Sequence, residues 1–186
     1  MTDTHPSTNL LSHFWAPLCA IGSSGSTGPN AQICVSVFGA SIVPNRPRLL
    51  ISLSKTNYTE GLVRQSGRLT VTLLSSAQSA LLKPLGLKSG KDGDKLAGLD
   101  VELTPSGIPT FPGGVGALEC EVLEPLDLGD ATAFLVAVRE RLEMAGGQPL
   151  PWSVAKTEVG EEFLRSWAKK SAHEQRIAQS VMHWND

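Results

Sequence analysis

The chain has 186 residues, 41% of them hydrophobic, and its 16 basic side chains nearly balance its 18 acidic ones. This length is typical of one domain with a buried core, and the balanced charge argues against a protein that binds nucleic acid by neutralising phosphates. No apolar run approaches the roughly 18 residues that span a bilayer, and no basic segment precedes an apolar one at the start, so we expect no membrane span and no signal peptide. The three cysteines, Cys19, Cys34 and Cys120, have no Cys-x-x-Cys spacing, which favours a reduced, cytoplasmic protein.

Strand patterns dominate the first part of the chain. The segment 22–28 (GSSGSTG) is interpreted as a flexible hairpin loop rather than a phosphate-binding loop, because no Lys-Ser or Lys-Thr pair follows it. Residues 48–54 (RLLISLS) form a nearly continuous apolar run, as in a strand covered on both faces, and residues 68–74 (RLTVTLL) alternate. Residues 118–122 (LECEV) and 133–142 (AFLVAVRERL) add two more strands. Because turn-forming clusters separate these segments, the sequence predicts a mainly β fold, a β-barrel.

Two short helices are expected between the strands. The first covers residues 58–66, with Asn57 suited to its N-cap and Gly67 just past its end. The second covers residues 77–82, ahead of Pro84.

The last part of the chain, residues 157–184, is expected to be helical. Acidic side chains open it and basic ones follow, which suits the helix dipole, and one long helix or two joined helices both fit. Its apolar side chains form two stripes: Phe163, Leu164, Trp167 and Ala168, then Ile177, Val181 and Trp184. We expect it to pack on the barrel or on a second subunit, and we divide the chain into a barrel domain, 1–148, and a C-terminal extension, 149–186.

Polar side chains interrupt the otherwise apolar segment 26–61, where one strand ends, a second follows and a helix begins. Ser and Thr hydroxyls, backbone N–H groups and Lys55 can meet at this place. A helix start also attracts anions through its free N–H groups and its dipole. A nucleotide-like ligand with a planar ring and a phosphate would use all of these groups together.

Five motifs follow one another in a characteristic order. An Asn-led strand ends in Ser-x-Phe (30–38), an apolar strand leads to Lys-x-Asn-x-Thr (55–59), and a helix leads to Ser-Gly-Arg (66–68). Asp-Lys-Leu-x-Gly-Leu follows at 94–99, and a Gly-Asp turn at 129–130 joins the last two strands. In this order and spacing the chain resembles the flavin reductase-like, FMN-binding split β-barrel family. The resemblance implies a split β-barrel with short flanking helices and a helical C-terminal extension.

The resemblance also implies which residues bind the flavin. The isoalloxazine ring would be lined by the backbone of the strand that Asn30 leads, through Gln32, Ile33, Cys34, Val35, Ser36 and Val37. The ribityl chain and the phosphate would be held by Ser52, Leu53, Ser54, Lys55, Asn57 and Thr59. Lys91 or Lys95, in a later loop, would add positive charge at the phosphate. Members of the family are typically homodimers with the flavin near the subunit interface.

The activity implied by the resemblance is that of an oxidoreductase. Bound FMN, or FAD, would take electrons from NAD(P)H and pass them to free flavin or another acceptor, and no side chain is needed as acid or base. Many NADH-using members have a histidine directly after the Gly-Asp turn, whereas Ala131 stands there in this sequence. The alternatives are a flavoprotein reduced by a protein partner, with an oxygenase or electron-transfer protein as partner, and a flavin-binding module without turnover.

Simpler structural roles remain open for several of these residues. Cys34 can be a small buried hydrophobe or a thiol beside the flavin, Asn57 can cap its helix, and Lys55 can be a solvated surface charge. Trp167 and Trp184 can be packing anchors or an aromatic lid over the flavin. The four histidines have no metal-ligand spacing, so we expect no metal site.

Overall fold

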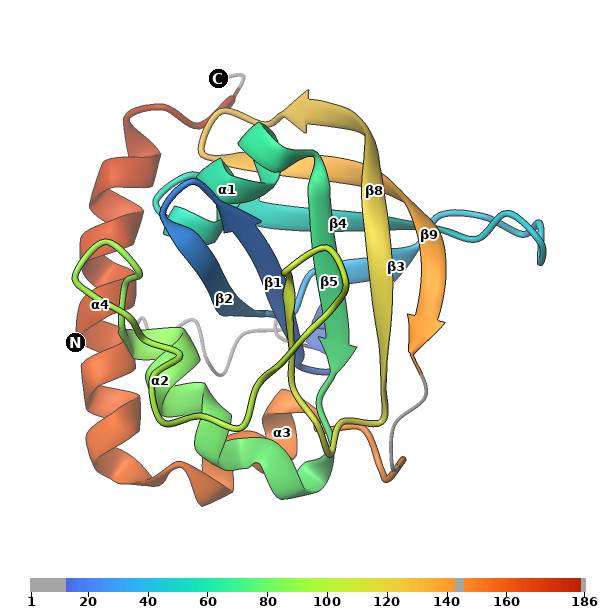
Figure 1. Ribbon diagram of the computed structural model, residues 1–186. Helices are drawn as coiled ribbons and strands as arrows, with labels where there is room; N and C mark the ends of the chain where they lie inside the picture. The colour runs from blue at the N-terminus through green and yellow to red at the C-terminus, as the bar shows by residue number, and fades with distance from the viewer. Residues whose placement is uncertain (1–12, 143–145, 185–186) are drawn as a thin grey trace.

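The computed structural model describes residues 13–142 and 146–184, and its largest element is a seven-stranded antiparallel sheet (Figure 1). Its strands are β1 (Cys19–Gly25), β2 (Gly28–Cys34), β3 (Val37–Gly39), β4 (Arg48–Ser54), β5 (Arg68–Leu73), β8 (Gly116–Asp127) and β9 (Ala131–Leu142). They are arranged in the order β2-β1-β5-β8-β9-β4-β3. A small second sheet pairs β6 (Glu102–Leu103) with β7 (Pro109–Thr110).

The two edge strands are neighbours in sequence, and this forces the sheet to curl. β2 ends at Cys34 and β3 begins at Val37, although they lie at opposite ends of the strand order. Because so short a connection spans only about 10 Å, the two edges must approach each other. In this connection the Ser36 carbonyl accepts a hydrogen bond from the Ser52 N–H (3.0 Å), which continues the pairing of β3 with β4 toward the end of β2. The result is a curled half-barrel that is split between β2 and β3, which confirms the predicted split β-barrel.

Most strands lie where the pattern of apolar residues predicts them. The segments 48–54 and 68–74 are β4 and β5, and the other two segments fall within β8 and β9. Both faces of β5 are buried, because its threonines contact the strand-like segment around β7. The Thr70 hydroxyl donates to the Pro109 carbonyl, and the Phe111 N–H donates to the Thr72 hydroxyl (3.4 Å).

The glycine-rich segment 22–28 is a hairpin, as predicted, but most of it is strand rather than flexible loop. β1 continues to Gly25 and β2 starts at Gly28, so two residues form the turn. A small residue is required at Gly22, since a Cβ there would lie 2.3 Å from the Pro109 carbonyl oxygen. The sequence therefore places glycine here for close packing between the two sheets rather than for flexibility.

Helix α1 (Tyr58–Ser66) has the predicted bounds, and Gly67 ends it in the left-handed region with φ 67°. The second expected helix differs from the prediction. A 3₁₀ helix (Ser76–Leu81) is followed directly by α2 (Leu82–Leu87), which contains Pro84. Pro84 does not end the helix because it lies in the first turn of α2, where its missing N–H would have had no intrahelical partner.

The buried apolar residues form two clusters on opposite sides of β1 and β2. The cluster inside the half-barrel comprises Cys19, Ile21, Cys34, Ile51, Leu53, Val63, Leu69, Val71, Cys120, Phe134 and Val136. The cluster outside it, between the sheet and the later helices, comprises Leu18, Ala20, Ala31, Leu74, Leu82, Leu85, Leu96, Phe111, Leu150, Ala155 and Phe163. The outer cluster forms because helices cover the outer face of β1 and β2. Both faces of these two strands therefore carry apolar side chains.

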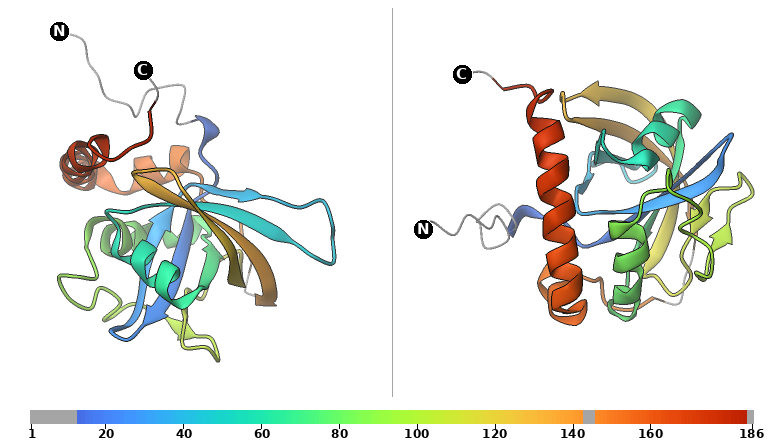
Figure 2. Two further views of the ribbon diagram at one scale, coloured as in Figure 1. Left: turned by 90° about the horizontal axis from the view of Figure 1, so that it is seen from above. Right: turned by 90° about the vertical axis from the view of Figure 1, so that its left-hand side faces the viewer.

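The C-terminal part of the chain forms two helices, α3 (Trp152–Glu158) and α4 (Gly160–Gln179), which meet at Gly160 with φ 77°. Helix α4 lies alongside α2 (Figure 2). The first predicted apolar stripe packs on the outer cluster through Phe163, Leu164 and Trp167. The second stripe is exposed, and the helix expected to continue to residue 184 ends at Gln179, before Val181 and Trp184. None of the helices in the described residues is long and apolar enough to cross a membrane.

Candidate functional site

Two neighbouring cavities lie between β2, α2 and α4. The larger one, ≈ 220 Å³ in volume, is mostly apolar and is lined by residues of β2, α2, α3 and α4. The smaller one, ≈ 40 Å³, is polar and lies at the start of α1 and at the loop that follows α2. The residues that line both are Gln32, Asn57, Leu85, Gly86, Lys170 and Glu174. The apolar cavity and the polar cavity therefore adjoin, and together they are called the groove below.

A buried hydrogen bond positions one wall of the polar cavity. The Asn30 amide nitrogen donates to the Thr59 hydroxyl oxygen at 2.7 Å, and the two residues are 3% and 1% exposed. Gly90 packs against this pair, since a Cβ there would lie 2.4 Å from Asn30 Oδ1. Because the Thr59 oxygen accepts this bond, its own proton is left to donate to a ligand.

The start of α1 supplies further donors to the groove. Asn57 occupies the N-cap position, but within the described part of the chain its side chain makes no capping bond. It lines both cavities instead. The first N–H groups of a nine-residue helix have no intrahelical acceptor and carry the positive end of the helix dipole. An anion near Asn57 and Thr59 would therefore be stabilised.

Three lysines line the polar cavity, Lys88, Lys95 and Lys170, and the last two differ in burial. Lys95 is 7% exposed, and its ammonium group donates to the carbonyls of Leu85 (3.3 Å) and Lys88 (3.2 Å). Burial, reinforced by the nearby charge of Lys170, lowers the pKa of Lys95 from its ordinary value of 10.5 to about 8. Lys170, on α4, is more accessible and forms an ion pair of 2.6 Å with Glu174.

Two residues that line the apolar cavity each carry a buried polar atom without a partner among the described residues. Gln32 Oε1 accepts no hydrogen bond, and Trp152 Nε1 donates none, among the residues that the structure describes. Both residues line the apolar cavity. An unpaired buried acceptor or donor costs about 1–3 kcal/mol, so such atoms point to a ligand that pairs with them.

Three tryptophans from distant parts of the sequence meet at the apolar cavity. The ring centroids of Trp15, Trp152 and Trp167 are 5.1 to 6.4 Å apart, in tilted and edge-to-face arrangements. Such large, rigid ring surfaces suit a planar aromatic ligand. Trp167 is therefore a packing residue and a cavity wall at once, whereas Trp184 is exposed.

A buried polar network holds α1, and with it the groove, against β9. The Glu60 carboxylate is 2.6 Å from the Arg64 guanidinium and accepts a hydrogen bond from the Thr132 hydroxyl. Arg64 also donates to Thr132 (2.6 Å). Because Thr132 is fully buried, this network fixes the start of α1 relative to the turn at 129–130.

The structure brings about half of the predicted flavin residues to the groove. Those that line it are Gln32, Ile33, Cys34, Val35, Asn57, Thr59 and Lys95, and Asn30 contacts Thr59 beneath it. Burial raises the pKa of Cys34 to about 11, so its thiol stays protonated and acts as an apolar wall.

The other predicted residues lie outside the two cavities: Ser36, Val37, Ser52, Leu53, Ser54, Lys55 and Lys91. Their roles toward a flavin stay predictions. Ser36 and Ser52 are hydrogen-bonded at the split of the barrel, and Leu53 is fully buried in the inner cluster. Lys55 pairs with Asp127 at 2.6 Å, and this bond holds the pKa of Asp127 below its usual value.

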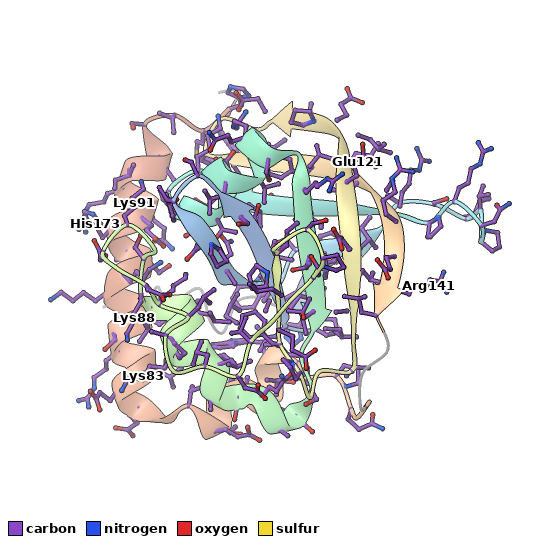
Figure 3. All side chains as sticks on the ribbon, in the orientation of Figure 1. Lys83, Lys88, Lys91, Glu121, Arg141 and His173 are labelled. Carbon is purple, nitrogen blue, oxygen red and sulfur yellow. The ribbon has the colours of Figure 1, made fainter. Side chains whose placement is uncertain are left out.

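Sequence reasoning missed the residues that α2, α3 and α4 contribute to the groove. These include Leu85, Gly86, Trp152, Phe163, Lys170 and Glu174. Lys88 also lines the polar cavity, and Figure 3 shows it with Lys91 on the side of the molecule where α4 lies. The sequence signals that could have indicated these residues are the apolar stripe with Trp167 and the lysine pair that follows it. No spacing in the sequence, however, predicts that α4 packs near β2.

Comparison with known proteins assigns the chain to a family. The Flavin reductase like domain matches residues 11–156, so the chain belongs to this family of FMN-binding split barrels. Helix α4 lies beyond the matched residues.

Individual relatives are distant. The chain is 25% identical to the high molecular weight rubredoxin of Moorella thermoacetica over 67% of this chain and 54% of that protein, and it thus spans about half of that relative. It is 26% identical to the reductase subunit HsaB of a flavin-dependent monooxygenase from Mycobacterium tuberculosis, over 77% of this chain and 74% of that one. Among solved structures, an FMN-binding protein from Thermus thermophilus with bound 1-cyclohex-2-enone superposes with a TM-score of 0.67 at 25% identity, covering 80% of this chain and 85% of that one.

Proposed function

We propose that the protein is an FMN-binding oxidoreductase that passes electrons from NAD(P)H, through FMN, to free flavin or another acceptor. The observation that carries this proposal is the groove, in which an aromatic cavity adjoins a polar cavity with three lysines. FMN has the same division, with a planar ring system at one end and a phosphate at the other. FAD shares the ring system and is the second candidate.

The residues that line the two cavities match FMN at both of its ends, the ring and the phosphate. The apolar cavity offers indole surfaces together with an unpaired acceptor, Gln32 Oε1, and an unpaired donor, Trp152 Nε1. The edge of an isoalloxazine ring carries both carbonyl oxygens and an N–H, which are the complements of these atoms. The polar cavity offers the Asn57 amide, the Thr59 hydroxyl and the start of α1 to a phosphate.

The chain's own contribution is binding and exclusion of water. When bound, FMN supplies the redox chemistry, accepting two electrons as a hydride from NAD(P)H and releasing two electrons to the acceptor. The tryptophans and Phe163 keep water from the ring, and the Glu60–Arg64–Thr132 network holds the start of α1 in place. None of these roles requires a side chain to transfer a proton.

Anaerobic reduction of the purified, FMN-loaded protein tests this proposal. We expect the flavin absorbance to bleach rapidly on addition of NADH or NADPH and to recover when free flavin or oxygen is supplied. Protein that binds no added FMN would refute the whole proposal. Bleaching by dithionite alone would refute the use of a nicotinamide and leave the flavin site standing.

A second candidate function is a flavoprotein reduced by a protein partner. Ala131 favours it, because a methyl group stands where many NADH-using relatives have an imidazole. The likeness to a high molecular weight rubredoxin and to a monooxygenase reductase subunit supports an electron-transfer protein or an oxygenase as partner. A flavin-binding module without turnover is the remaining alternative, and it is the outcome if neither a nicotinamide nor a protein reductant reduces the bound flavin.

A homodimer is also proposed, through the outer face of the sheet at β3, β4 and β8. Phe38 pairs with Leu50 across β3 and β4, and both side chains are exposed, at 45% and 38%. Leu126 of β8 lies on the same face two residues further along and is 58% exposed. A second copy would bury this apolar face. Leu50→Lys is expected to convert the dimer into a monomer in light scattering after size exclusion, and a monomeric wild-type protein would refute the proposal.

A further inference from the structure

The polar cavity contains more positive than negative charge. Lys88, Lys95 and Lys170 line it, and Glu174 is the carboxylate that lines it with them. Lys95 lies within the residues matched by the family domain, whereas Lys170 lies on α4, beyond them. The additional charge therefore comes from the part of the chain that the family pattern does not cover.

Lys95 is fixed in the wall, and no counter-ion pairs with it in the described part of the chain. Its ammonium group is held by two backbone carbonyls and forms no ion pair among the described residues. Burial of an ammonium group in this way is unfavourable unless an anion compensates it, and the lowered pKa of Lys95 has burial and the nearby Lys170 as its causes. The arrangement of the two lysines is therefore unfavourable in the absence of an anion.

Lys170 is paired, but only within its own helix. Its Nζ is 2.6 Å from Glu174 Oε1, one turn further along α4, and the two side chains are 29% and 30% exposed. An i,i+4 pair of this kind is weak and is easily replaced by a stronger partner. A phosphate, with nearly two negative charges and three acceptor oxygens, is such a partner for an ammonium group.

We propose that Lys170 is a phosphate-binding residue for FMN, contributed by the C-terminal helix of the same chain, and that Glu174 holds its ammonium group when no phosphate is present. This inference rests on the proposed function, because it assumes that the flavin lies in the groove with its phosphate in the polar cavity. It assigns two opposite roles to two neighbouring residues of one helix. Lys170 strengthens the binding of the phosphate, and the Glu174 carboxylate competes with it.

The test compares two ligands that differ only in the phosphate. The dissociation constants of FMN and riboflavin are measured by titrating flavin-free protein and following flavin fluorescence or heat. The variants are Lys170→Met, which keeps an unbranched apolar stem, and Glu174→Gln, which removes only the charge. Lys169→Met is the matched control, because Lys169 is exposed on the same helix and lines neither cavity.

The expected results follow from the charges. Lys170→Met weakens FMN binding by about tenfold and leaves riboflavin binding nearly unchanged, as loss of one charge-assisted hydrogen bond predicts. Glu174→Gln strengthens FMN binding by roughly threefold, again without an effect on riboflavin. Lys169→Met changes neither ligand.

Other outcomes separate the inference from the proposed function. If wild-type protein binds FMN but Lys170→Met weakens FMN and riboflavin equally, or weakens neither, the role of Lys170 is refuted and the flavin site stands. If Glu174→Gln weakens FMN as much as Lys170→Met does, the ion pair is structural and the inference is also wrong. If wild-type protein binds neither ligand, the proposed function fails and this inference fails with it.

Discussion

Replacing Gln32 by methionine is expected to stabilise the flavin-free protein and at the same time to weaken flavin binding. Gln32 is 6% exposed, and its Oε1 accepts no hydrogen bond among the described residues. An unsatisfied buried acceptor costs about 1–3 kcal/mol, and methionine has nearly the same length without the polar group. We therefore expect Gln32→Met to raise the free energy of unfolding by about 1 kcal/mol. The same change removes a partner of the flavin, so FMN affinity should fall about tenfold.

Gln78 provides the matched control. It is a buried glutamine outside the groove, and all of its hydrogen bonds are within the chain. Its Oε1 accepts from the Ser75 N–H (3.1 Å), and its Nε2 donates to the carbonyls of Phe111 (3.3 Å) and Pro112 (2.8 Å). Gln78→Met leaves these groups without partners, so it should lower the free energy of unfolding by about 2 kcal/mol or more. It should leave the FMN affinity of the folded protein nearly unchanged.

Urea denaturation of flavin-free protein and FMN titration together test whether Gln32 lacks a partner in the flavin-free protein and contacts the bound flavin. Opposite changes in stability for Gln32→Met and Gln78→Met would support the groove as a site built for a ligand. Equal destabilisation by both variants would mean that Gln32 is satisfied in the flavin-free protein. In that case, an unchanged FMN affinity in Gln32→Met would also remove Gln32 from the binding site.

Three further predictions follow from the buried polar groups. Thr132→Val should lower the free energy of unfolding by about 1–3 kcal/mol in urea denaturation, because Glu60 loses a buried donor; an unchanged stability would contradict the network. The folded pKa of Lys95, about 8, lies below its ordinary 10.5, so the unfolded chain binds more protons between these values and stability should rise with pH across this window. Lys95→Met should abolish that rise, and an equal rise in the variant would exclude Lys95 as its source. Burial raises the pKa of the three cysteine thiols to about 11 or 12, so a disulfide reagent at pH 7.5 should label them far faster in urea than in native protein; equal rates would refute their burial.

The strands and α1 could be predicted because their signals are local. A nearly continuous apolar run defined β4, alternation defined β5, and a glycine just past the helix defined the end of α1. The 3₁₀ helix and α2 were harder to predict, because a proline such as Pro84 marks the end of a helix in most contexts but lies in the first turn of a helix here. The strand character of residues 22–25 was hidden because it depends on pairing with two neighbouring strands and on contact with Pro109.

The site was predictable only where the chain contributes continuous segments. Gln32 to Val35 and Asn57 to Thr59 belong to motifs that can be read in order, and both line the groove. Lys55 matched the same motif but pairs with Asp127, because the strand direction at the end of β4 takes its side chain to the turn after β8. The contribution of α4 depends on tertiary packing across more than a hundred residues, for which a single sequence carries no period or spacing. The division of the chain at residue 148 stays a prediction.

The clustering of indoles around the apolar cavity gives the protein an intrinsic optical probe. Of its four tryptophans, Trp15, Trp152 and Trp167 lie at the cavity, and Trp184 is exposed near the end of the chain. A flavin absorbs at the wavelengths where indole emits, so energy transfer should extinguish the emission of the three tryptophans at the cavity and spare much of the red-shifted emission of Trp184. Ligand entry can thus be timed in a stopped-flow instrument without any label, and the residual spectrum reports separately on the C-terminal end.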